Sequence, residues 1–193
     1  FNVESVDYKS VRFNIWDIGG QPKLRPLWKH YYLNTQAVVF VIDSSDKERL
    51  PEALSELSKL MSEKELKDAA LLILANKQDI AGAESIESIT QQLALYKLCC
   101  GHSWNIQASD ALSGDGLHDG LEWLSRQLLA LIRDGQRWNE FVWPEKGIER
   151  QLAERPRAFD GECAVATAES TLLRHKSTSS SNDAAFTRLT ISV

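Results

Sequence analysis

Asp17-Ile18-Gly19-Gly20-Gln21, Asn76-Lys77-Gln78-Asp79 and Ser109-Asp110-Ala111 are the three stretches that decide the fold of this 193-residue chain. Each stretch directly follows residues whose apolar pattern is typical of a β-strand. In an α/β sheet, ligands bind at the loops that leave the carboxyl ends of the strands. We therefore expect the three stretches to form one binding site at one edge of a sheet.

Strands and helices are expected to alternate along the chain. An antiparallel hairpin is predicted over residues 2 to 16, with a tight connection at Lys9-Ser10. Continuous apolar runs predict buried parallel strands at residues 37 to 42 and 70 to 74, and residues 104 to 108 are a weaker strand candidate. Helical periodicity fills the gaps through Leu50, Leu54, Leu57 and Met61, through Ile86, Ile89 and Leu93 behind a Ser85 N-cap, and through Leu117, Leu121, Leu124, Leu128 and Leu131. The predicted fold class is α/β, with a doubly wound and mostly parallel sheet.

The second and third stretches have side chains that suit a guanine base. The Asp79 carboxylate can accept two hydrogen bonds from the guanine N1 and N2 donors, an edge that adenine does not offer. Asn76 would tie neighbouring loops together, and Lys77 would lay its stem across the base. In the Ser109 loop, the backbone amide of Ala111 would meet the guanine O6.

The first stretch suits the phosphate end of a nucleotide. Asp17 is a candidate for a water-bridged Mg²⁺ contact, because Mg²⁺ keeps several waters and uses few carboxylates. The Gly20 amide could approach the γ-phosphate, and Gln21 could orient the attacking water in catalysis. Asp-x-Gly-Gly alone is an ordinary turn. The ordered set of three stretches is what predicts a guanine-nucleotide fold.

Composition excludes some classes of protein. A net charge of -5 and a pI near 5.4 argue against nucleic-acid binding. The longest apolar runs are of strand length, far short of the roughly 20 residues needed to cross a bilayer. The cysteines form no metal-binding spacing and are expected to be reduced thiols, and the four histidines form no cluster.

At these residues the chain resembles the ADP-ribosylation factor (ARF) family of small GTPases. The resemblance covers Phe1 to about Leu129 and implies a P-loop NTPase-type G-domain that binds GTP or GDP with Mg²⁺ and hydrolyses GTP. The matching runs are Phe1-Asn2-Val3-Glu4, Trp16 to Gln21, Arg25-Pro26-Leu27-Trp28-Lys29-His30-Tyr31, Asn76 to Asp79 and Ser113-Gly114-Asp115-Gly116-Leu117.

The resemblance also implies partners. The GTP-loaded state would expose Phe1, Trp16 and Tyr31 as an aromatic effector patch, although the residues alone are equally typical of strand faces or scattered surface positions. Exchange factors, GTPase-activating proteins and effectors would act on a cytoplasmic protein at Golgi or endosomal membranes, in vesicle-mediated transport. An activating protein would supply an arginine finger.

Within the family, three runs look most similar to the ARF domain at the end of a tripartite-motif ubiquitin ligase: Lys29 to Phe40, Glu63 to Leu66 and Tyr96 to Gly101. Three functions therefore stay open. The chain could belong to an ARF-type GTPase switch, to a GTP-regulated module of a ubiquitin ligase, or to a non-functional truncated product.

The chain departs from the family at several points. No G-x-x-x-x-G-K-[ST] phosphate loop occurs, and the chain starts at Phe1, so we expect a domain cut off before its second strand, without the switch-I Thr and the amphipathic membrane helix. Asp110 and Leu112 replace the usual Cys and Thr, and Pro22 follows Gln21 where Asp is usual.

Two regions are expected, a partial ARF-type domain over residues 1–132 and an unmatched tail over 133–193 with little packed structure. The resemblance places the missing first strand between the strands at 11 to 16 and 37 to 42. Its loss would leave two unpaired strand edges, so the chain is expected to aggregate or unfold non-cooperatively, and to bind GTP no tighter than the millimolar range, about -4 kcal/mol.

Overall fold

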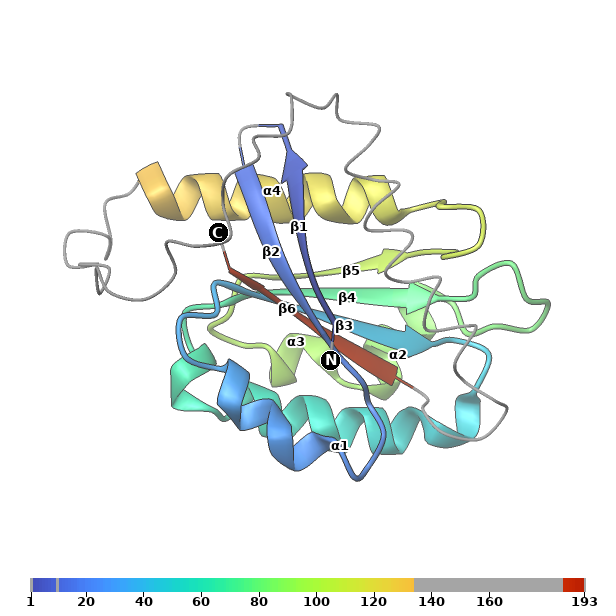
Figure 1. Ribbon diagram of the computed structural model, residues 1–193. Helices are drawn as coiled ribbons and strands as arrows, with labels where there is room; N and C mark the ends of the chain where they lie inside the picture. Colours follow the sequence, from blue (N-terminus) through green and yellow to red (C-terminus); the bar gives the residue numbers. More distant parts are fainter. Residues whose placement is uncertain (1, 10, 134–185, 193) are drawn as a thin grey trace.

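The computed structural model describes residues 2–9, 11–133 and 186–192, which form one six-stranded sheet covered by helices (Figure 1). Among these residues, no helix is both long and apolar enough to cross a membrane. The elements are β1 (Asn2–Tyr8), β2 (Val11–Ile18), η1 (Arg25–Tyr31), β3 (Ala37–Asp43), η2 (Lys47–Arg49), α1 (Leu50–Met61), η3 (Lys64–Leu66), β4 (Ala70–Asn76), α2 (Ile86–Gln92), α3 (Leu95–Leu98), β5 (Trp104–Ala108), α4 (Leu117–Arg133) and β6 (Phe186–Ser192).

The strands lie in the order β1-β2-β6-β3-β4-β5. β1 and β2 form the expected antiparallel hairpin, in which Tyr8 is opposite Val11 and Lys9 takes a left-handed backbone with φ of 53°. β3, β4 and β5 run parallel to one another. The predicted α/β fold class is confirmed. The sheet is mixed, because β1 runs antiparallel to β2 and β6 runs antiparallel to both of its neighbours.

Helices cover both faces of the sheet (Figure 1). One core contains Val38, Phe40 and Ile42 of β3 together with buried residues of η1, α1, α2 and α3. The other contains Val39 and Val41 of β3 together with buried residues of the hairpin and α4. Successive β3 residues therefore pack into different layers, which explains why this strand is apolar along its whole length.

The helices α1, α2 and α4 begin where the sequence predicts, whereas α3 was not predicted. Pro51 lies in the first turn of α1, where its missing amide proton costs nothing. Ser85 caps α2, its Oγ accepting a hydrogen bond of 3.2 Å from the Ser88 amide. α4 runs for 17 residues and buries Leu117, Leu124 and Leu128 against the sheet.

The expectation of little packed structure after residue 132 is wrong for residues 186–192. These residues form β6, which lies between β2 and β3 (Figure 1). The expected pair of unpaired strand edges is therefore also wrong, since β6 pairs with both.

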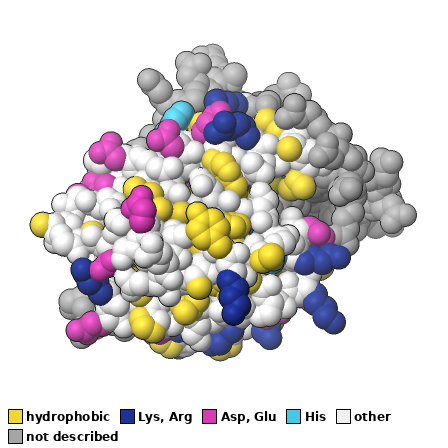
Figure 2. Space-filling model, turned by 180° about the vertical axis from the view of Figure 1, so that it is seen from behind, with side chains coloured by type: hydrophobic (Ala, Val, Ile, Leu, Met, Phe, Trp, Pro, Cys, Tyr) yellow, Lys and Arg dark blue, Asp and Glu magenta, His cyan; other side chains and the backbone are white. Residues whose placement is uncertain are grey.

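Figure 2 shows the face turned away from the view of Figure 1. Hydrophobic side chains lie near the middle of this face, and basic and acidic side chains are interspersed mainly toward its margin. Charges of both signs are therefore mixed on this face.

Candidate functional site

The three stretches singled out in the sequence lie at one edge of the sheet, where β2, β4 and β5 end. The strands extend slightly further than the sequence predicts: β2 runs through Asp17 to Ile18, and β4 includes Asn76. β6 begins at this same edge, because Phe186 is opposite Ile42 at the end of β3.

Asn76 ties the loop after β4 to the loop after β5, as predicted. Its Oδ1 accepts hydrogen bonds of 2.9 Å from the Ala111 amide and 3.4 Å from Ser109 Oγ. A backbone bond of 3.2 Å from the Gln78 amide to the Ser109 carbonyl joins the loops again. Ser109 and Ala111 are both buried, so the connection is shielded from water.

The loop after β5 is held by the Asp110 carboxylate. Asp110 is buried and accepts hydrogen bonds of 2.9 Å from the Leu112 amide and 3.0 Å from the Ser113 amide. An acidic side chain at this position therefore shapes the loop itself. The Ala111 amide donates to Asn76, so contact with a guanine O6 requires this proton to change its acceptor.

Gly116 anchors the same loop to β5. It has φ of 76°, and a Cβ at this position would lie 1.9 Å from the Ala108 carbonyl oxygen. Only glycine combines a left-handed backbone with so close an approach. The turn into α4 therefore fixes the position of the loop between β5 and α4.

Lys77 and Asp79 lie at the open side of these loops. Lys77 has φ of 68°, which for a residue other than glycine costs of the order of 1–3 kcal/mol and is typical of functional loops. Asp79 is exposed, and no described side chain forms a hydrogen bond with its carboxylate. Its acceptors are thus available to a ligand.

The Lys77 ammonium forms an ion pair with Asp43, at the end of β3. Asp43 also accepts hydrogen bonds of 3.0 Å and 2.6 Å from the amide and hydroxyl of Ser45. Burial alone would raise the pKa of Asp43, but the bonds from Lys77 and Ser45 outweigh burial and hold the pKa below its usual value. Sequence reasoning missed this pair, whose partners lie 34 positions apart.

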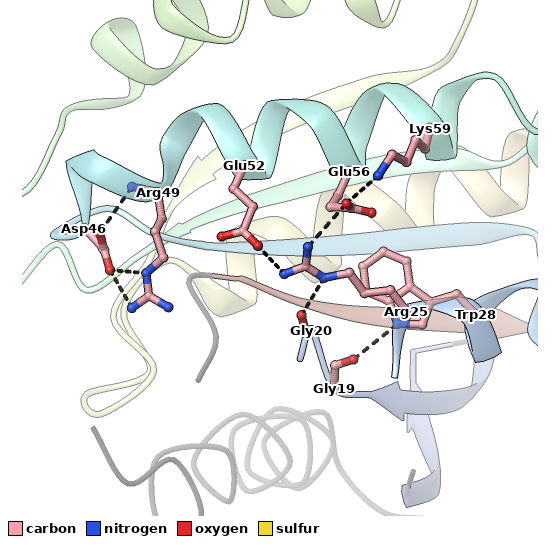
Figure 3. A network of polar contacts seen from close by, with 9 residues as sticks. All are labelled: Gly19, Gly20, Arg25, Trp28, Asp46, Arg49, Glu52, Glu56 and Lys59. Carbon is pink, nitrogen blue, oxygen red and sulfur yellow. Dashed lines mark hydrogen bonds and ion pairs between the residues drawn. The ribbon is translucent and has the colours of Figure 1, made fainter. Parts of the chain in front are cut away.

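The glycine pair after β2 is held through its carbonyl groups (Figure 3). Trp28 Nε1 donates to the Gly19 carbonyl at 3.2 Å, and Arg25 Nε donates to the Gly20 carbonyl at 2.8 Å. Because a peptide unit is planar, these bonds also set the directions of the amides of Gly20 and Gln21. Asp17 is buried at the end of β2, and Gln21 is half-buried in the turn that follows.

Arg25 connects this loop to α1 (Figure 3). Its guanidinium donates to Glu52 at 2.7 Å and to Glu56 at 3.3 Å, and Lys59 also donates to Glu56 at 2.7 Å. The side chains of Arg25 and Glu56 are only 14% and 11% exposed, so water screens their interaction weakly. Arg25 and Trp28 were part of the quoted sequence pattern, but their carbonyl contacts could not be assigned without coordinates.

Two of the three aromatic residues expected to form an effector patch lie together. The ring centroids of Trp16 and Tyr31 are 5.4 Å apart, and both residues are half-buried. Phe1 lies outside the described residues. Trp16 and Tyr31 also pack against the core beneath α1, so they serve the fold whether or not a partner binds them.

Together the topology and the loop positions define an α/β domain of the small-GTPase type. Residues 1–128 match the sequence model of the ADP-ribosylation factor family, and the chain belongs to this family. A similar solved structure is that of the Arl6 BBS3 small GTPase from Trypanosoma brucei with bound nucleotide analogue GppNp. The two chains are 36% identical, with a TM-score of 0.65 over 67% of this chain and 79% of that one.

The residues at the base end fit a guanine nucleotide, because a free carboxylate stands beside two loops that are already joined. For Mg²⁺, the described residues hold no group of three or more potential ligands of the His, Cys, Asp and Glu types. A single carboxylate, completed by water and phosphate oxygens, is nevertheless a normal Mg²⁺ environment. Asp17, the residue that the sequence predicts for this contact, is buried near the end of β2.

Proposed function

We propose that this chain carries the base-recognition half of an ARF-type GTP switch. The observation that carries the proposal is the exposed Asp79 carboxylate beside loops that Asn76 joins through Ser109 and Ala111. Asp79 would accept from guanine N1 and N2, and the stem of Lys77 would cover the base. Preorganised loops support recognition because the cost of ordering them is already met by folding.

At the phosphate end the chain offers fewer contacts. The 193 residues contain no G-x-x-x-x-G-K-[ST] sequence, so within them the Gly20 amide and Asp17, through Mg²⁺, are the groups proposed to face the phosphates. Gln21 is the proposed residue for orienting water in GTP hydrolysis. With so few phosphate contacts, GTP affinity of this chain is expected in the millimolar range, about -4 kcal/mol.

The family membership supports a wider role that we also propose. A GTP-dependent change in the loop held by Arg25 and Trp28 would reach Trp16 and Tyr31, the proposed effector contact. Exchange factors and GTPase-activating proteins would control this state at Golgi or endosomal membranes during vesicle transport.

A second candidate function is a GTP-regulated module of a tripartite-motif ubiquitin ligase. It rests on the resemblance, inferred from the sequence, of residues 29–40, 63–66 and 96–101 to the ARF domain of such a ligase. The full-length transcript distinguishes the two: zinc-spaced Cys and His residues followed by a coiled coil support the ligase, and a glycine-initiated amphipathic helix supports the free GTPase.

Base recognition is tested by changing the base that Asp79 would select. Asp79→Asn should weaken GDP binding and favour xanthosine diphosphate, whose 2-oxo group accepts a hydrogen bond instead of donating one. Binding is followed through the amide NMR signals of Lys77 and Ala111, with ADP as the control nucleotide. Asp68→Asn is the matched control, since Asp68 is exposed at the opposite edge of the sheet, just before β4.

The expected result is that GDP shifts both amides, ADP does not, and only Asp79→Asn reverses the preference between GDP and xanthosine diphosphate. Equal responses to GDP and ADP in the unchanged chain would refute base recognition at this site.

A further inference from the structure

β6 completes the sheet although it lies outside the part of the chain that matches the family. The family match ends at residue 128, whereas β6 starts at Phe186. Residues 188–192 pair with residues 14–18 of β2, and residues 186–191 pair with residues 37–42 of β3. Figure 1 shows β6 in red between these two strands.

The interval that β6 fills is a buried one. On one side of it, Ile15 and Ile18 of β2 are buried, and on the other, Phe40 and Val41 of β3 are buried, each pair divided between the two helical layers. Backbone groups of both strands would have no water to bond to in such surroundings, and an unpaired buried amide or carbonyl is costly. Only an extended segment can satisfy both rows of groups at once.

We propose that the interval between β2 and β3 is a strand-binding site, and that residues 186–192 of the same chain occupy it as an intramolecular ligand. Recognition works through the two backbone ladders, one on each side of β6. β6 borders the nucleotide site, since Leu189 is opposite Asp17, but its occupation of the interval can be tested without nucleotide.

The direction of β6 gives this occupation a consequence. A strand that leads into a phosphate-binding turn must end at the carboxyl edge of the parallel strands. β6 instead begins there, with Phe186 opposite Ile42, and ends at the other edge, with Ser192 opposite Asn14. While β6 fills the interval, no strand can deliver a phosphate loop through it. β6 and a phosphate-loop strand therefore cannot occupy this position at the same time.

The covalent connection favours occupation by the same chain over a second copy. Residues 134–185 join α4 to β6, and their contour length, at about 3.3 Å per residue, far exceeds the dimensions of the domain. Because this connection can reach the interval between β2 and β3, the effective concentration of the chain's own strand there is up to about the millimolar range. At micromolar protein, the chain's own strand therefore has the advantage.

The test is hydrogen exchange of the complete 193-residue chain, followed by mass spectrometry, together with its solution mass. Amides of residues 186–192 and of residues 37–42 should exchange at least about tenfold more slowly than in an unstructured peptide, in a monomer. Leu189→Pro removes a ladder amide from the middle of β6 and should abolish protection in β6 and lower it in β3. Leu189→Val is the matched control, because it keeps the backbone donor and should leave protection unchanged.

A synthetic peptide of sequence Phe-Thr-Arg-Leu-Thr-Ile-Ser should restore β3 protection in the Leu189→Pro chain, and the same peptide with proline at its fourth position should not. Exchange of residues 186–192 at the unstructured rate in the unchanged chain would overturn the proposal. So would protection confined to a dimer, since a second copy would then be the occupant. Both of these measurements use the unchanged chain and stay decisive even if the proline variant does not fold.

Discussion

The Arg25 network provides the sharpest test of how the loop after β2 is held. Arg25→Ala removes the donor to the Gly20 carbonyl and the partially buried contact with Glu56, while Glu56 keeps Lys59 as a partner. A hydrogen bond to a charged group contributes roughly 1.5–3 kcal/mol, and a buried carbonyl left unpaired costs about 1–3 kcal/mol. The two contributions overlap, because they share one side chain. We expect a loss of about 2–4 kcal/mol in the free energy of unfolding.

Urea denaturation followed by tryptophan fluorescence measures this loss. With a slope of about 2 kcal/mol per molar urea, the midpoint should fall by roughly 1–2 M. Lys29→Ala is the matched control, because Lys29 is 72% exposed and its pair with Glu63, at 3.5 Å, is screened by water, so its midpoint should not move. An Arg25→Ala midpoint equal to that of the unchanged chain would refute the view that Arg25 links the loop to α1.

Three further predictions concern stability and reactivity. Gly116→Ala should destabilise the domain by clearly more than Gly101→Ala, measured by thermal unfolding; both positions require a left-handed backbone, but only at Gly116 would the new Cβ meet a β5 carbonyl. Cys99, whose pKa burial raises to about 11, should resist alkylation at pH 8 while the exposed Cys100 reacts, as shown by peptide mapping; equal labelling of the two would contradict the burial of Cys99. Asp43→Asn should destabilise the chain at pH 7, and this effect should shrink as the pH falls below about 4. A carboxyl whose pKa is lowered by folding stabilises fully above its unfolded pKa and loses that contribution as the pH falls through its folded pKa. Urea denaturation over a pH series measures the effect, and an effect that stays constant as the pH falls would contradict this.

Most of the fold could be predicted because its signals are local. The apolar runs of β3 and β4, the alternation in β2 and the cap at Ser85 each depend on side chains within one element. β6 could not be predicted in the same way. Its residues are rich in aromatic and β-branched types, which is a local signal for a strand, but its partners lie near the start of the chain. The sequence pattern of a strand does not indicate which distant strands it will pair with, here β2 and β3.

In the candidate site, too, local features could be predicted and contacts between distant elements could not. That Asn76 joins neighbouring loops was predicted from its residue type and position. Its partner was not, because the Ala111 amide was expected to meet the guanine O6 and instead donates to Asn76. The Asp43–Lys77 pair and the bonds from Trp28 and Arg25 to the glycine carbonyls depend on how separate elements pack. The sequence marked Asp110 only as a departure from the family pattern. The structure shows that its carboxylate holds the loop after β5 in shape.

The most direct test of the account compares GMP with GTP and Mg²⁺ as ligands of the 193-residue chain in one NMR titration. If the chain recognises the base and contributes few phosphate contacts, both should bind with Kd values of the order of millimolar, about -4 kcal/mol, and differ by no more than about threefold. Because Asp17 is the one proposed Mg²⁺ contact of this chain, removal of Mg²⁺ should weaken GTP binding by no more than about threefold and leave GMP binding unchanged. Micromolar binding of GTP that depends on Mg²⁺, with GMP remaining weak, would contradict the account.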